Sequence, residues 1–282
     1  MSTSDEVAAA GQLACLLEVS APKPGNVSPG RHFHDTRFED FLVSAVAIGP
    51  ALAGAGDCGL GKTIHAAVDA TARWTRSNTN LGIILLLAPL ARAALSGGNS
   101  LQGSLRKTLA ATTIADAAEV YAAIRRARPG GLGAAAAEDV AAAPTVTLLE
   151  VMALAAERDS VAREYATGFD ITFGIGAPAL RRARAAGLDW SDAVVETYLQ
   201  LLAAVPDTHI ARKLGRQAAE VVSRQAREVA QAGGVRTDEG RRALAAFDAE
   251  LRDPTNSHNP GTTADLSCAA LFVVILEDCR NR

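Results

Sequence analysis

The chain has 282 residues, 49% of them hydrophobic and 21% charged, with a formal net charge of -3 at pH 7. This apolar content excludes a disordered chain, and 28 Lys+Arg against 31 Asp+Glu leaves no basic excess for binding nucleic acid. Alanine supplies about a fifth of the residues and aromatics only 4%, so the composition predicts closely packed helices rather than a β-sandwich.

The four cysteines do not have the spacing of a zinc ribbon or of a disulfide framework. The N-terminus carries acidic residues where a signal peptide would be basic. The most apolar stretches, 83–87 and 269–276, are far shorter than the roughly 20 residues that a membrane span needs. These features predict a soluble, cytoplasmic protein with no membrane partner.

Helix signals recur along the whole chain, whereas only 170–175 has the composition of a strand. Capping-box spacings at 36–39 and 147–150 predict two helix starts. Other helices are predicted from Ser4 to Ser20, over 60–76, 81–96, 101–111 and 114–127, from Ser191 to Val205, from Asp207 to Ala232, after Thr237, and from Thr262 to Cys279. We expect an all-α single domain over 1–282, a bundle of roughly ten or more helices with functional loops between them.

The first polar segment that separates the predicted helices is the loop over 21–36. Two prolines force an extended backbone there, and Gly25 permits close approach of another group. The loop carries Lys23, Asn26, His34 and Asp35, and we interpret it as one wall of a site. A plain connecting loop is the alternative.

Two further polar segments stand at predicted helix starts. Asn78, Thr79 and Asn80 precede an apolar helix, where free amides and the helix dipole favour anions. Ordinary N-capping by Thr79 or Asn80 is the alternative, and it explains one residue of the cluster. The segment 206–213 begins with Asp207, which either caps the following helix or holds Mg²⁺ for a polyphosphate. The anion-binding set crowded into its first turns is Thr208, His209, Arg212 and Lys213.

The fourth polar segment, 256–266, leads into the apolar C-terminal helix. Gly261, Thr262 and Asp265 lie at its start, where Thr262 and Asp265 also have capping-box spacing. Four of the five histidines fall in these four segments, which favours a shared polar site over isolated structural histidines.

The string GDCGLGKT over 56–63 matches the P-loop pattern of phosphate-binding proteins. A P-loop needs a preceding β-strand, and the upstream sequence here continues a helix. We therefore expect a helix–helix turn with Lys62 exposed to solvent.

Taken together, the segments resemble the triphosphoribosyl-dephospho-CoA synthase family, and in particular its shorter bacterial and archaeal members. The matching sequences, in the family's order, are APKPGNV (21–27), HDTRFEDFLVSA (34–45), NTNLGIILLLAPL (78–90), PDTHIARKLG (206–215) and NPGTTADL (259–266). The resemblance implies an all-α domain that joins ATP to 3′-dephospho-CoA and releases adenine. This chain differs from better-known members at Asn80-Leu81, where they tend to have His-Lys, and at His209, where they have Asn; they also carry a Gly pair near 213–215.

Such a reaction passes through an oxocarbenium-like state and must hold a triphosphate without hydrolysing it. We expect Lys23, Arg212 and Lys213 to bind phosphates, with Mg²⁺ on Asp207 and Asp265. Asp35 is the expected base for the attacking hydroxyl, and His34 or His209 the group that protonates the purine, and the sequence allows these two roles to be exchanged. The residues expected to complete the nucleotide site are Gly25, Asn26, Asn78, Thr79, Asn80, Thr208, Gly261 and Thr262.

Two other functions fit the same segments. One is a Mg²⁺-dependent enzyme similar to ADP-ribosyl hydrolases, which would release its sugar to water. The other is a helical nucleotide-binding protein without catalysis, in which the aspartates only cap helices. The alanine-rich helix faces are compatible with a homodimer and equally with close packing inside one chain.

Overall fold

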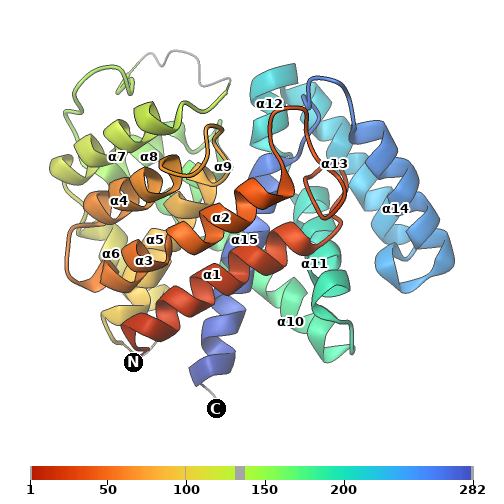
Figure 1. The fold of residues 1–282 in the computed structure, drawn as a ribbon, viewed down its shortest axis with the longest axis horizontal. Helices are drawn as coiled ribbons and strands as arrows, with labels where there is room; N and C mark the ends of the chain where they lie inside the picture. The colour runs from red at the N-terminus through yellow and green to blue at the C-terminus, as the bar shows by residue number, and fades with distance from the viewer. Residues whose placement is uncertain (1, 99, 131–136, 281–282) are drawn as a thin grey trace.

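In the computed structural model, which describes residues 2–98, 100–130 and 137–280, helices follow one another and no strand occurs in these ranges (Figure 1). The predicted all-α fold is confirmed. The N-terminal helices are α1 (Ser4–Ser20), α2 (Phe38–Ala47), α3 (Gly49–Ala53), α4 (Leu60–Ala72), α5 (Leu81–Leu95), α6 (Leu101–Ala110) and α7 (Ile114–Ala127). The later helices are α8 (Leu148–Ala155), α9 (Ser160–Thr167), α10 (Ala177–Ala185), α11 (Trp190–Ala204), α12 (Thr208–Leu214), α13 (Arg216–Gln231), α14 (Asp238–Leu251) and α15 (Gly261–Arg280).

Side-chain caps fix most helix starts close to the predicted positions. The capping box at Thr147 and Glu150 is confirmed, because the Glu150 carboxylate accepts from the Thr147 amide at 2.8 Å while Thr147 Oγ1 accepts from the Glu150 amide. The predicted box at 36–39 is shifted by one residue, since the Asp40 carboxylate accepts from the Arg37 amide at 2.8 Å. The N-caps that differ from the predicted ones are Thr3 for Ser4, Arg37 for Thr36 and Asp189 for Ser191.

Two predicted elements are wrong. The long helix from Asp207 is divided into α12 and α13 at Gly215, whose φ of +90° breaks the helical path. The strand over 170–175 is helical instead, with a π-helix at Thr172–Gly176. The buried Glu164 carboxylate accepts from the Thr172 amide at 2.7 Å and so fixes the start of that segment.

The apolar side chains form two clusters. The larger one is centred on α5 and α15, and α15 passes through the middle of the molecule in contact with α1, α5, α10 and α11 (Figure 1). The smaller cluster joins α11, α12, α13 and α14. Many of the buried residues are alanines, which allow these helices to pack closely.

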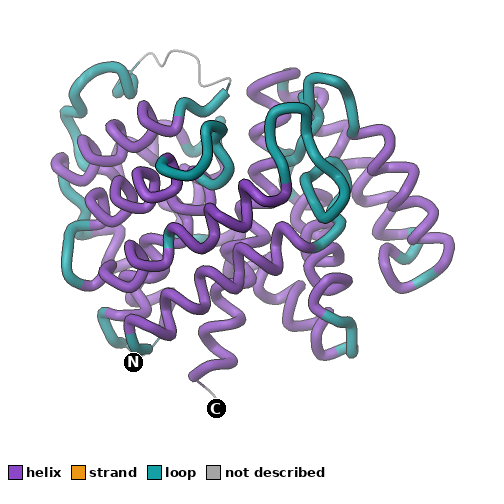
Figure 2. The backbone as a smooth tube through the Cα atoms, in the orientation of Figure 1, coloured by secondary structure: helices purple, strands orange, loops and turns teal. Residues whose placement is uncertain are grey.

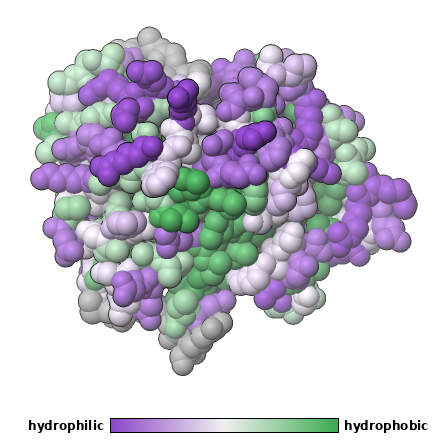
Figure 3. Space-filling view, in the orientation of Figure 1, coloured by the Kyte–Doolittle hydropathy of each residue, from purple (hydrophilic) through white to green (hydrophobic). Residues whose placement is uncertain are grey.

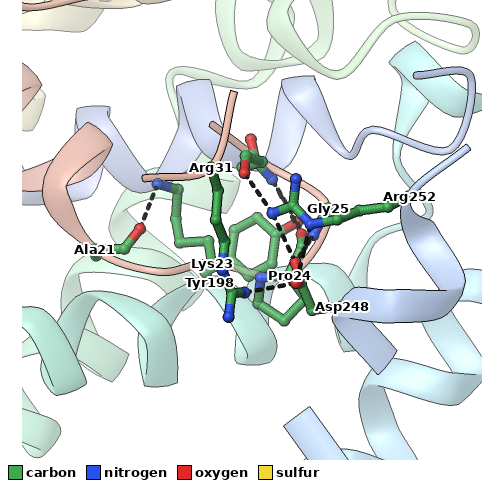
Figure 4. A network of polar contacts seen from close by, with 9 residues as sticks. Ala21, Lys23, Pro24, Gly25, Arg31, Tyr198, Asp248 and Arg252 are labelled. Carbon is green, nitrogen blue, oxygen red and sulfur yellow. Dashed lines mark hydrogen bonds and ion pairs between the residues drawn. The ribbon is translucent and has the colours of Figure 1, made fainter. Parts of the chain in front are cut away.

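The loop after α1 is tied to α14 by one carboxylate. Asp248 accepts hydrogen bonds from the Gly25 amide at 2.8 Å, from Arg31 Nη1 at 2.5 Å and from Arg252 Nε at 2.9 Å (Figure 4). Gly25 has a φ of +74°, and a Cβ there would lie 2.9 Å from Leu251 Cβ, so glycine allows the close approach. The loop is thereby held at the end of the helices where the other polar loops gather (Figure 2).

The segment Phe38–Gly56, which is longer than the apolar stretches noted in the sequence, is long and apolar enough to span a membrane by length and composition alone. It is divided between α2, α3 and a short 3₁₀ turn, and Pro50 lies in the first turn of α3. Both helices pack on α1. Val46 of α2 and Leu13 of α1 leave apolar surface exposed, and Figure 3 shows an apolar area in the middle of this face.

The four cysteines are free thiols.

Candidate active site

A cavity of about 450 Å³ opens at the loop end of the molecule. Its wall is formed by the loop over 26–36, the starts of α5 and α15, one side of α12, and the helices α7, α8 and α9. This volume is within the range of small-molecule sites. The predicted site residues that line it are Asn26, His34, Asp35, Asn78, Thr79, Asn80, His209, Arg212, Lys213, Gly261, Thr262 and Asp265.

The predicted base and one predicted acid lie at the cavity mouth. The side chains of His34 and Asp35 are 64% and 60% exposed, and His34 Nε2 lies 3.9 Å from Asp35 Oδ2. Lys213 faces the same opening, where its ammonium donates to the Asn256 carbonyl at 3.1 Å. Burial lowers the pKa of Lys213, and the charges of Asp253 and Asp35 act in the opposite direction. Asp35 is therefore accessible to a ligand and close to a cation.

The α12 side of the cavity is cationic. Arg212 Nη1 donates to Asp159 Oδ2 at 2.7 Å, and Arg212 Nη2 lies 3.4 Å from His209 Nδ1. Burial, with the charges of Lys213 and Arg212, lowers the pKa of His209 to about 3. His209 is therefore a neutral imidazole at pH 7, a state suited to orienting a ligand rather than to protonating a purine.

This pKa predicts a specific pH response. The folded protein disfavours protonated His209, whereas the unfolded chain binds that proton below about pH 6.5. We therefore expect the contribution of His209 to the free energy of unfolding to be fully present above pH 6.5 and to be lost as the pH falls from 6.5 towards 3. Ring NMR of the five histidines should show one titration midpoint far below 6.5, assigned by the loss of that signal in His209→Gln. A bound triphosphate should raise that midpoint, because negative charge favours the imidazolium. A His209 midpoint near 6.5 in the free protein would contradict the buried, cation-flanked geometry.

Asp265 is the unpartnered carboxylate of the site. Its side chain faces the cavity from the second turn of α15 and makes no hydrogen bond or ion pair within the part of the chain that the structure describes. Burial raises the pKa of Asp265 well above its usual value, and the charges of Glu18 and Asp207 add to this. It packs against Gly82 at the start of α5, where a Cβ would lie 2.0 Å from Asp265 Oδ2. Only glycine leaves room for the carboxylate.

Asp207, the other expected metal ligand, has a different position. Its Oδ1 accepts from the His209 and Ile210 amides at 2.8 and 3.0 Å, and its Oδ2 accepts from the Thr263 amide and hydroxyl at 2.7 and 2.8 Å. It is fully buried and lies outside the cavity lining. Both oxygens are occupied, so Asp207 caps α12 and ties α15 to it instead of holding an ion. Thr208 is likewise structural, bonded to Thr262 Oγ1 at 3.2 Å.

Lys23 was expected to bind phosphate, but its ammonium is buried behind the cavity wall. Lys23 Nζ lies 2.9 Å from Glu18 Oε1, and the two side chains are 1% and 4% exposed. Nζ also donates to the Glu18 and Ala21 carbonyls, the second contact being drawn in Figure 4. All three of its donors are used, so Lys23 holds the end of α1. Gly25 is also outside the lining.

The polar residues before α5 line the cavity and also make hydrogen bonds within the protein. Asn78 Oδ1 accepts from the Leu81 amide at 3.1 Å, Thr79 Oγ1 lies 2.6 Å from Ser44 Oγ, and Asn80 Nδ2 donates to Thr71 Oγ1 at 3.2 Å. Asn80 is the N-cap residue of α5 but makes no side-chain capping bond, and Thr79 is bonded to Ser44, so the N-capping alternative for these two residues is wrong.

Several polar lining residues were not assigned to the site from the sequence, among them Glu18, Arg158 and Asn259. Glu18 gave no signal, because it lies inside a regular helix. Arg158 lines the cavity, and its guanidinium has no partner within the described ranges. Asn259 Oδ1 is buried without a partner there, although its segment had been singled out. An unsatisfied buried amide in a cavity wall is suited to a ligand hydroxyl or amine.

The P-loop-like segment plays no part in the cavity. Residues 56–63 connect a 3₁₀ turn to α4, no strand precedes them, and Lys62 is exposed as expected. The Gly61 amide donates to Asp116 Oδ1 at 2.8 Å, and a Cβ on Gly61 would lie 2.5 Å from the Asp116 carbonyl oxygen. The glycines in this string allow α4 to pack on α7.

The fold and the cavity define a class of protein: a helical protein with one cavity wall that carries cationic side chains together with carboxylates and imidazoles. The chain belongs to the ATP:dephospho-CoA triphosphoribosyl transferase family, whose model matches residues 4–282.

Relatives with provisional names support this membership. A triphosphoribosyl-dephospho-CoA synthase structure from Archaeoglobus fulgidus, named provisionally, superposes with a TM-score of 0.64 at 29% identity, covering 84% of this chain and 98% of that one. Proteins provisionally named 2-(5″-triphosphoribosyl)-3′-dephosphocoenzyme-A synthase are 38% identical over 117 residues in Azotobacter vinelandii and 34% over 122 in Pseudomonas savastanoi pv. phaseolicola. These matches span 41% and 43% of this chain and 39% and 41% of the relatives.

Proposed function

We propose that the protein transfers the 5-triphosphoribosyl group of ATP to a ribose hydroxyl of 3′-dephospho-CoA and releases adenine. In this reaction the C1′–N9 bond of ATP breaks, a C1′–O bond forms, the hydroxyl loses a proton and the adenine gains one. The observation that supports the proposal is the cavity itself, whose lining combines Arg212 and Lys213 with Asp265, a carboxylate without a partner among the described residues.

The residues take roles according to their positions. Arg212, Lys213 and the unpaired Arg158 are the cations that face the cavity, so we assign them to phosphates. Asp35 at the mouth accepts the hydroxyl proton, and His34 beside it protonates the leaving purine; neutral His209 orients a ligand oxygen.

The proposal includes Mg²⁺, and one residue, Asp265, is suited to hold it. The described residues contain no group of three histidine, cysteine or carboxylate side chains that could hold a metal. Asp265 fits a cation carried in on the triphosphate, because its oxygens have no protein partner and Mg²⁺ is commonly held by one or two carboxylates plus phosphates. Asp207 does not fit. Mg²⁺ bound at Asp265 would neutralise phosphate charge.

Asp35→Asn is expected to reduce adenine release by at least about 10²-fold while leaving the thermal midpoint unchanged, because the carboxyl is 60% exposed. The measurement is chromatographic quantification of adenine from ATP, Mg²⁺ and dephospho-CoA. Asp57→Asn, another exposed carboxylate remote from the cavity, is the matched control and should retain full activity. Wild-type turnover in the Asp35 variant would refute its role as the base.

The same assay separates the competing functions. Adenine release that needs no acceptor would indicate the hydrolase, and ATP that is bound but unchanged would indicate a binding protein. We further propose one functional domain over 1–282, a cytoplasmic location, and a homodimer supported by the exposed apolar surface of Leu13, Val43 and Val46.

A further inference from the structure

The wall of the cavity opposite α12 and α15 is apolar over the length of α8. Leu148, Val151, Met152 and Ala155 follow the i, i+3, i+4, i+7 spacing of one helix face, and all four line the cavity. Leu154 joins them at the rim with 57% of its surface exposed. Leu148 and Met152 are buried in the core, whereas Val151, Ala155 and Leu154 keep apolar surface open to the cavity. This remaining surface is suited to an apolar ligand group.

Charge is distributed unevenly along this wall. At the C-terminal end of α8 the lining continues into Arg158 and Asp159, and Asp159 is bonded to Arg212. The lining on the other side includes Glu138, whose pKa is lowered by hydrogen bonds from Thr145. Phosphates are therefore favoured near Arg158 and Arg212 and disfavoured near ionised Glu138, where an uncharged chain is better accommodated.

We infer that the α8 face binds the uncharged pantetheine arm of the acceptor, with the acceptor's pyrophosphate near Arg158. This inference rests on the proposed function. The wall is aliphatic, with Val120 and Ile124 of α7 beside the α8 face, and the buried Tyr121 hydroxyl is bonded to the Glu138 carbonyl. Such a wall offers little stacking surface for a purine but suits a flexible aliphatic amide chain, and the rim at Leu154 leaves room for its thiol end.

The test compares two acceptors that differ only in the arm. Dephospho-CoA and ADP share the adenosine and the pyrophosphate, and ADP lacks the pantetheine. Wild-type protein should prefer dephospho-CoA in kcat/KM for adenine release and should bind it more tightly in equilibrium dialysis. Leu154→Asn should reduce this preference about tenfold, through KM for dephospho-CoA, with KM for ATP unchanged. Ile114→Asn, at another exposed aliphatic residue outside the cavity, is the matched control and should keep the preference.

The outcomes are distinct. An unchanged preference in Leu154→Asn, or a wild-type protein that does not distinguish the two acceptors, overturns the inference. A raised KM for ATP with an unchanged acceptor preference also overturns it, because the purine of ATP then occupies the α8 face. If wild-type protein releases no adenine with either acceptor, the proposed function fails, while tighter dialysis binding of dephospho-CoA that Leu154→Asn abolishes would still support the arm site.

Discussion

Asp265→Asn should lower kcat/KM for adenine release on the order of 10³-fold and leave the fold as stable as before or more stable. Activity should fall because Asp265 is the unpartnered carboxylate of the cavity that, in the proposed reaction, would face the triphosphate and its cation. Stability does not fall because burial and the charges of Glu18 and Asp207 raise the pKa of Asp265, so its ionised form costs the folded state free energy. The stability gain should be largest at neutral pH and should vanish below the ordinary carboxyl pKa of 3.8.

Asp207→Asn is the matched comparison, since it changes the same atoms in a neighbouring buried carboxylate. An amide nitrogen cannot accept the two hydrogen bonds from Thr263, so we expect a loss of about 1–3 kcal/mol in urea unfolding. The two variants should thus change stability in opposite directions. If Asp265→Asn were as destabilising as Asp207→Asn while remaining active, Asp265 would be a cap and not a site residue.

Lys23→Met should destabilise the protein by about 3–5 kcal/mol, because it leaves the Glu18 carboxylate buried without its partner. Urea unfolding measures the change. Lys62→Met, at an exposed lysine, is the control and should be nearly neutral.

The double variant Lys23→Met with Glu18→Gln should recover much of the loss, because it removes the unpaired charge. This rescue distinguishes the ion pair from the phosphate role that the sequence suggested for Lys23. A Lys23→Met protein with unchanged stability and a raised KM for ATP would restore the phosphate role.

The helical fold was predictable because its signals are local. Capping residues such as Thr147, glycine stops and apolar spacing act within a few residues of the chain, and they placed most helices correctly. The elements that failed depended on tertiary context: Gly215 divides a continuous helical pattern, and Glu164 holds residues 171 and 172 in a helix where the composition favoured a strand.

The site was predictable only as a set of segments. Polar residues between helices identified many of the polar side chains in the cavity lining, because helix packing alone does not explain such residues. Their individual roles depend on contacts far along the chain, such as Asp207 with Thr263 or Lys23 with Glu18, and composition carries no record of these. The apolar α8 face lies outside the polar segments, so the sequence did not indicate that this face lines the cavity.

The most direct test of the central claim follows the ribose. Wild-type protein is incubated with Mg²⁺, dephospho-CoA and ATP labelled with ¹³C in the ribose, and the products are analysed by mass spectrometry. We predict one free adenine for each dephospho-CoA that gains a labelled triphosphoribosyl group, with the bond at its ribose. Labelled ribose triphosphate free in solution, with dephospho-CoA unchanged, would contradict a transferase, and so would ATP that remains intact.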